Sequence, residues 1–248
     1  MRTVAGLLAI CLLLGPSLGS AGAQGITQQQ ADDMLKELRG IRAVLERMAA
    51  GQASARPTTP PPAPDPRVRL PKVGGHVLGK PDAPITMVEF TDLQCQYCAR
   101  FANGAFPQIK SEYIDKGLVR FVTRDFPLDI HPHAELAARA SRCAGEQGRF
   151  WEVRRTLMIN YSKLNPDFIT ATATDAKLDM AAFTGCLSSG RFKDEIRKEL
   201  DEAFDFGVEG TPTFFIGRTQ GEGLEGQRVV GALPFEMFDA KFKELLKK

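Results

Sequence analysis

The sequence lacks the features that mark nucleic-acid-binding and membrane-embedded proteins. Its 248 residues carry a formal net charge of only +2, and no basic stripe with interleaved aromatic side chains occurs, so nucleic-acid binding has no support. Its N-terminal apolar run, Val4–Leu14, is shorter than the about 20 residues of a membrane-spanning helix. No internal repeat is visible. Hydrophobic residues make up 43% and charged residues 25% of the chain, which predicts a globular domain with a sizeable core.

Residues 1–23 are typical of a secretory signal peptide. Arg2 supplies positive charge ahead of the apolar stretch, and Ala21-Gly22-Ala23 fits the small-x-small rule for cleavage before Gln24. A retained signal anchor is the alternative. We therefore expect export, most simply into a bacterial periplasm.

Cysteine is scarce: the chain has five, and Cys11 lies within the predicted signal peptide. Processing would leave Cys95, Cys98, Cys143 and Cys186. An even count in an exported protein suggests two disulfides. We predict that Cys143 and Cys186 form a permanent disulfide, with a second electron-relay pair as the alternative.

The sequence Cys95-Gln96-Tyr97-Cys98 directly follows an apolar run at 85–90, which predicts a dithiol at a strand-to-helix junction. The N–H groups and dipole of a helix N-terminus stabilise a thiolate, so the pKa of Cys95 should fall below about 8.5. The i, i+3 spacing places both sulfurs on one helix face. Cys95 should therefore be the solvent-facing nucleophile, with Cys98 more deeply buried.

Two further segments precede this site. Residues 24–52 are predicted to hold a helix at 27–49, where Thr27 and Gln30 resemble a capping box. Residues 53–71 are rich in proline and predict a semi-rigid linker. The helix carries apolar residues at alternating spacings of three and four, which indicates a short coiled coil and self-association. The alternative is an amphipathic helix packed on its own domain. The apolar positions are Ala31, Met34, Leu38, Ile41, Leu45 and Met48.

From residue 72 onward the pattern predicts an α/β domain: strand-helix-strand, a helical block at about 132–206, then strand-strand-helix. The predicted strands are 76–79, 85–91, 118–125, 213–217 and 228–230. The predicted helices are 95–115, 134–145, 150–159, 176–186, 190–206 and 234–248.

Several motifs together resemble the DsbA-like, thioredoxin-fold disulfide oxidoreductase family. The resemblance covers about residues 72–248 and implies a thioredoxin fold with an inserted helical domain. In this chain that domain would follow the N-terminal helix and the proline-rich linker. The motifs are Gly79-Lys80-Pro81-Asp82-Ala83-Pro84, Val88-Glu89-Phe90-Thr91-Asp92, the CxxC, Arg124-Asp125-Phe126-Pro127-Leu128, His131-Pro132-His133-Ala134 and Gly207-Val208-Glu209-Gly210-Thr211-Pro212-Thr213-Phe214.

The resemblance implies roles for residues outside the CxxC. Glu89 would lie beneath the disulfide and relay protons, because burial raises a carboxyl pKa toward the range of a general base. An outward-facing Glu89 is the alternative. The Thr211–Pro212 bond would be cis, and the Thr211 backbone would pair with an extended substrate segment.

Two departures bear on the type of reaction. The best-known DsbA has Pro-His between its cysteines, whereas this chain has Gln96-Tyr97. Thr211 before the proline, and the N-terminal heptads, resemble oligomeric isomerases of the same superfamily more than the classical oxidase.

We therefore predict an exported thiol:disulfide oxidoreductase that needs no cofactor or metal beyond the redox-active Cys95–Cys98 disulfide. Its expected partners are unfolded or thiol-containing exported proteins, a membrane redox partner for recycling, and further copies of itself through residues 27–49. The alternatives are an oligomeric isomerase or reductase, a non-catalytic chaperone, and a thiol protein that binds Cu(I). A zinc site is disfavoured, because Cys143 and Cys186 are single and His131-x-His133 is not a usual ligand spacing.

Overall fold

The computed structural model describes residues 27–54 and 68–247. The chain divides into two compact units, residues 1–61 and 62–248. The predicted signal peptide at 1–23 and most of the predicted linker lie outside the described residues.

The described part of the first unit, residues 27–54, forms one long helix, α1 (Gln28–Ser54), which runs five residues beyond the predicted end. The predicted capping box is present: the Gln30 N–H donates to Thr27 Oγ1 at 3.3 Å, and the Thr27 N–H donates to Gln30 Oε1 at 3.0 Å. Six large apolar side chains in the described part of this helix are between 48% and 59% exposed: Met34, Leu35, Leu38, Ile41, Val44 and Leu45.

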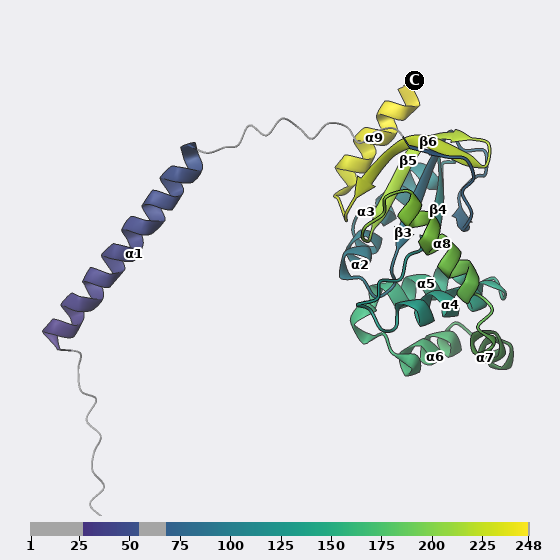
Figure 1. The fold of residues 1–248 in the computed structure, drawn as a ribbon, viewed down its shortest axis with the longest axis horizontal. Coiled ribbons are helices and arrows are strands. Elements are labelled where there is room, and N and C mark those ends of the chain that lie inside the picture. Colours follow the sequence, from purple (N-terminus) through teal and green to yellow (C-terminus); the bar gives the residue numbers. More distant parts are fainter. Residues whose placement is uncertain (1–26, 55–67, 248) are drawn as a thin grey trace, which may run out of the picture. The chain divides into compact units, whose positions relative to one another are not determined.

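The second unit is built on a six-stranded sheet in the order β1-β6-β5-β3-β4-β2. β3 and β4 run parallel, and the other neighbouring strands run antiparallel. This arrangement confirms the predicted α/β class (Figure 1). The strands are β1 (Val68–Leu70), β2 (His76–Leu78), β3 (Ile85–Thr91), β4 (Val119–Asp125), β5 (Thr213–Gln220) and β6 (Gly223–Val230).

The first strand lies where a linker was predicted, so the predicted boundary at residue 71 is wrong. Val68 pairs with Gly226 and Leu70 with Leu224, which makes β1 an outer strand of the sheet. The approach is so close that a Cβ at Gly223 would lie 1.9 Å from the Leu70 carbonyl oxygen. Only glycine fits at position 223 so close to the Leu70 backbone. Because β1 pairs with β6, the sheet begins at Val68, within the predicted linker.

The helix predicted at 95–115 is divided into three pieces: α2 (Gln96–Asn103), α3 (Ala105–Ile109) and the π-helix η1 (Lys110–Ile114). Gly104, with φ −94° and ψ −90°, separates the first two, and Pro107 follows in α3, where it cannot donate a backbone hydrogen bond. The predicted strands at 213–217 and 228–230 are longer and form one hairpin, β5–β6.

The helical insertion lies between β4 and β5, and its helices α4 to α7 gather at one end of the sheet (Figure 1). It contains α6, which the sequence analysis missed. The remaining helices are α4 (Ala134–Gly145), α5 (Phe150–Ile159), the short 3₁₀ turn η2 (Tyr161–Lys163), α6 (Pro166–Asp175), α7 (Met180–Ser189), α8 (Lys193–Asp205) and the C-terminal α9 (Phe235–Lys247).

Successive side chains of β3 point to opposite faces of the sheet, and they pack in two separate apolar clusters. Ile85 and Met87 pack with Phe238 and Phe242 of α9, whereas Val88 and Phe90 pack in a separate cluster on the opposite face. A third cluster fills the helical insertion and reaches α2. This third cluster contains all four cysteines of the described chain: Cys95, Cys98, Cys143 and Cys186.

Candidate active site

Asp92 shapes the turn between β3 and α2 that delivers Cys95. Its carboxylate accepts hydrogen bonds from the backbone N–H groups of Gln94 (2.6 Å) and Leu128 (2.8 Å), and lies 2.8 Å from His131 Nδ1. Its carbonyl accepts from the Cys95 N–H at 3.2 Å. One buried side chain thus fixes the loop before the CxxC to the loop after β4.

Cys95 occupies the N-cap position of α2, in extended backbone conformation. Its thiol is free and lies 3.5 Å from the Thr211 carbonyl oxygen. The pKa of Cys95 is lowered to about 5, chiefly by the hydrogen bond from the Cys98 thiol. Burial opposes this effect, while Thr211 and the N–H groups of Cys98 and Tyr97 add to it. A thiolate at neutral pH follows.

The side chain of Cys95 is covered more than predicted. It is 4% exposed, whereas Cys98 is 0% exposed. The expectation of an openly solvent-facing Cys95 is therefore wrong, because the Thr211–Pro212 loop packs against it. The deeper position of Cys98 is as expected. Burial raises the pKa of Cys98 well above its usual range, and the neighbouring Cys95 and the charge of Glu89 raise it further.

The peptide bond between Thr211 and Pro212 is cis, as the resemblance implied. We call residues 207–212 the cis-proline loop. It is fixed at its base, where the Gly231 N–H donates to the Pro212 carbonyl at 2.8 Å and Thr213 Oγ1 donates to the Gly210 carbonyl at 2.7 Å. The loop thus holds a backbone edge beside the reactive sulfur.

Glu89 lies on β3 and is 1% exposed, so the outward-facing alternative is wrong. Its Oε2 accepts from Arg154 Nη2 at 2.6 Å and from Thr123 Oγ1 at 3.1 Å. Burial raises the pKa of Glu89, and Arg154 and Thr123 oppose that rise. The raised pKa was expected, but the arginine partner was not.

Gln96 and Tyr97, the two residues between the cysteines, form the first turn of α2. Tyr97 is 47% exposed, and the guanidinium of Arg100 lies 5.1 Å from the centre of its ring. A partly exposed aromatic ring beside the thiol pair offers an apolar contact for a substrate chain.

Cys143 and Cys186 form a disulfide between α4 and α7, the pairing that the sequence analysis predicted. Both residues are buried in the core of the helical insertion. They are therefore not available to complete a zinc site with Cys95 and Cys98.

Sequence reasoning assigned no role to three site residues: Asp92, Thr123 and Arg154. Asp92 carried a signal, because an aspartate just before a helix commonly forms a side-chain turn with the residue two positions on. Arg154 carried none, since its burial depends on how α5 packs. His131 and His133 lie in the loop before α4. The His131 ring contacts the Asp92 carboxylate, and the backbone N–H of His133 donates to Gln94 Oε1 at 2.8 Å, whereas the His133 side chain makes no capping hydrogen bond.

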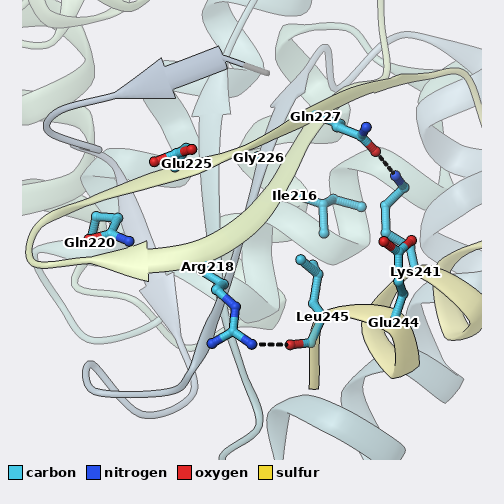
Figure 2. Close-up of a pocket in the computed structure, with 9 residues that line it drawn as sticks. All are labelled: Ile216, Arg218, Gln220, Glu225, Gly226, Gln227, Lys241, Glu244 and Leu245. Atoms are coloured by element: carbon cyan, nitrogen blue, oxygen red, sulfur yellow. Dashed lines mark hydrogen bonds between the residues drawn. The ribbon is translucent and has the colours of Figure 1, made fainter. Parts of the chain in front are cut away.

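A pocket of about 290 Å³ lies away from the thiol pair, between the β5–β6 hairpin and α9. Figure 2 shows Arg218 reaching the Leu245 carbonyl and Lys241 reaching Gln227 across it. No cysteine lines it, so it is not part of the candidate site. Over residues 27–54 and 68–247, no helix has the length and apolar character needed to cross a bilayer.

Comparisons with known proteins agree with this geometry. A sequence model described as thioredoxin matches residues 72–230. The structure resembles Wolbachia pipientis alpha-DsbA1 with a TM-score of 0.64 and 27% identity, covering 71% of this chain and 92% of that one. Oxidised BdbD from Bacillus subtilis gives a TM-score of 0.59 and 25% identity, covering 69% and 92%.

Curated relatives include Na(+)/H(+) antiporter NhaA 3 of Salinispora tropica, which is 38% identical over 142 residues. The match covers 57% of this chain but only 21% of that protein, so this chain spans about a fifth of the length of such relatives. The match of the thioredoxin model and the likeness to solved DsbA structures show that the chain belongs to the DsbA-like thioredoxin-fold family.

Proposed function

We propose that this protein is an exported thiol:disulfide oxidoreductase that acts on substrate proteins through Cys95 and Cys98. One observation carries the proposal: Cys95 is the N-cap residue of α2, and its free thiol lies 3.5 Å from the Thr211 carbonyl oxygen of the cis-proline loop. Its pKa is lowered to about 5, and a low-pKa sulfur is a good leaving group in thiol–disulfide exchange.

In the oxidising direction, a substrate thiolate attacks the Cys95 sulfur of the disulfide form. A mixed disulfide forms and Cys98 leaves. The substrate's second thiolate then displaces Cys95, so that the substrate loses two electrons and the enzyme disulfide gains them and becomes the dithiol. The Thr211 backbone would pair with the extended substrate during both steps. A membrane redox partner would reoxidise the dithiol.

The test is the reduction potential of the thiol pair, from a glutathione titration of the full-length protein. A value near about −120 mV supports an oxidase, and one near about −270 mV supports a reductase. A Cys95→Ala variant should lose both thiol oxidation and insulin reduction. Retained aggregation suppression in that variant would favour a chaperone, and copper bound by wild type but lost in the variant would favour metal handling.

An oligomeric isomerase is the second candidate, and α1 is the observation that favours it. Its apolar side chains are about half exposed, and in the heptad register Glu37 would face Arg42 of a parallel second copy. A Leu38→Asp variant should lower the mass measured by light scattering, whereas Arg39→Asp, on the polar face, should not. An unchanged mass in Leu38→Asp would remove this candidate.

A further inference from the structure

A buried cluster of three side chains joins β3, β4 and α5. Val153 and Leu157 of α5, on either side of Arg154, pack in the same apolar core as Cys98. Glu89 comes from β3, Thr123 from β4 and Arg154 from α5 of the helical insertion. Arg154 Nη2 donates to both Glu89 Oε2 (2.6 Å) and Thr123 Oγ1 (2.8 Å). The side chains of Arg154 and Glu89 are 7% and 1% exposed, so this ion pair is little screened by water.

The cluster is coupled to the buried thiol. The charge of Glu89 raises the pKa of Cys98, so the protonation of the two groups is linked. A buried Cys98 thiol is a poor nucleophile until a base removes its proton. Glu89 is the buried carboxylate whose charge acts on Cys98, and it can serve as this base if its own affinity for the proton is in a useful range.

The surroundings of Glu89 determine that affinity. Burial raises its pKa most, and Asp125 of β4 raises it further, whereas Arg154 and Thr123 lower it. His76 of β2 pairs with Thr123 across the sheet. The pKa of His76 is lowered to about 4, chiefly by burial, so it is neutral at pH 7. Arg154 is thus the cation that compensates the buried carboxylate, and a guanidinium is not deprotonated in proteins.

We propose that Arg154 is a positioning residue for thiol–disulfide exchange, which sets the proton affinity of Glu89 so that Glu89 can take the Cys98 proton. The helical insertion, through one side chain, thereby controls the resolving step at the CxxC. This inference rests on the proposed function.

The step occurs when the reduced enzyme attacks a disulfide. The Cys95 thiolate forms a mixed disulfide and releases one thiolate. The Cys98 proton then passes to Glu89, and the Cys98 thiolate attacks the Cys95 sulfur. The Cys95–Cys98 bond forms, the second thiolate leaves, and Glu89 returns the proton to solvent. The enzyme dithiol loses two electrons, and the attacked disulfide gains them.

An aromatic disulfide reagent separates the two steps in the reduced full-length protein, because each released thiolate absorbs light. The first phase reports the attack by Cys95, and the second reports resolution by Cys98. In Arg154→Met, we expect the first phase to stay within about twofold of wild type. The second phase should slow about tenfold at pH 7, with its acid limb moved to higher pH.

Matched variants isolate the charge. Arg154→Lys keeps a cation and should retain the second phase within about threefold. Arg155→Met makes the same change at the next residue of α5, an exposed position, and should leave both phases unchanged. Glu89→Gln should lose the acid limb of the carboxylate, leaving only a rise at higher pH as Cys98 itself ionises, and should slow resolution at pH 7 roughly a hundredfold. Glu89→Gln/Arg154→Met should behave like Glu89→Gln alone.

An acid limb that stays in place in folded Arg154→Met would overturn the assignment and leave Arg154 a structural residue. If Arg154→Met does not fold, Glu89→Gln decides, because an acid limb that keeps its wild-type position without the carboxylate also overturns the assignment. A first phase that is absent from wild type, or survives in Cys95→Ala, would overturn the proposed function and this assignment with it.

Discussion

The two cysteine pairs share one apolar core but differ in their position along their helices. Cys95 is the N-cap residue of α2, and Cys98 lies in the first turn. Cys143 and Cys186 lie in the last turns of α4 and α7, where the helix dipole disfavours an anion. All four residues are at most 4% exposed.

The comparison shows that burial does not separate a reactive cysteine from a structural one in this fold. The difference comes from the neighbours. Backbone N–H groups and a second thiol surround Cys95 and lower its pKa, whereas Cys143 and Cys186 meet each other across two packed helices. The following predictions test this contrast, from the largest expected effect to the smallest.

Removal of Cys98 should have the largest effect on chemistry. In Cys98→Ala, Cys95 still attacks a disulfide, but the mixed disulfide has no intramolecular partner to resolve it. We expect resolution to slow about a thousandfold or more, because an intramolecular thiol acts at a very high effective concentration. Mass spectrometry of the trapped adduct measures this. Normal turnover in Cys98→Ala would contradict the assigned roles.

Removal of the second pair should affect stability instead. In Cys143→Ala/Cys186→Ala, the loop of residues between α4 and α7 is no longer closed. We expect the free energy of unfolding to fall by about 4 kcal/mol or less on the chain-entropy argument. Urea unfolding measures this, and alkylation of Cys95 in the folded variant should be unchanged. A loss of exchange activity in the folded variant would show that the pairs are coupled.

The pH dependence of alkylation should distinguish the thiols of the CxxC. Because the pKa of Cys95 is lowered to about 5, its reaction with iodoacetamide should be fast at pH 7 and fall below pH 5. In the unfolded protein the midpoint should return to about 8.5. The lowered pKa also predicts that the reduced form gains stability as pH rises from about 5 to about 8.5. A folded-state midpoint near 8.5 would contradict the thiolate assignment.

A smaller effect is expected from Asp92→Asn. In the wild-type protein, one carboxylate oxygen of Asp92 accepts from the Gln94 N–H and the other from the Leu128 N–H. Asparagine keeps only one acceptor oxygen, so one of these two bonds is lost. We expect a loss of about 1–2 kcal/mol of unfolding free energy and slower alkylation of Cys95. Asp129→Asn, an exposed change in the loop that follows β4, is the matched control. Equal effects from the two variants would show that Asp92 does not shape the site.

Much of the fold followed from periodicity, and the missed elements have particular causes. β1 is three residues long and forms only because β6 offers a partner with Gly223 at the contact. α6 did carry a local signal, since Asn165 caps it and Pro166 occupies its first turn. The long β5–β6 hairpin was obscured by its glycines. A Cβ at Gly217 would lie 2.0 Å from the Glu225 carbonyl oxygen.

The candidate site was predicted where its chemistry is local in sequence. The CxxC and the cis bond before Pro212 belong to recognisable motifs. The covering of Cys95 and the pairing of Glu89 with Arg154 depend on segments far apart in the chain. A helix pattern also gives no reason to bury an arginine, because arginine is almost never fully buried without a partner.

The two outer strands of the sheet, β1 and β2, are three residues long each. Long, open strand edges template cross-β stacking between chains. The proposed substrates are unfolded polypeptides, whose backbone N–H and C=O groups are free to pair with an exposed strand edge. Because both edge strands are short, an unfolded substrate would find little edge to extend the sheet and start an aggregate. Backbone pairing with the substrate would then be confined to the cis-proline loop beside Cys95.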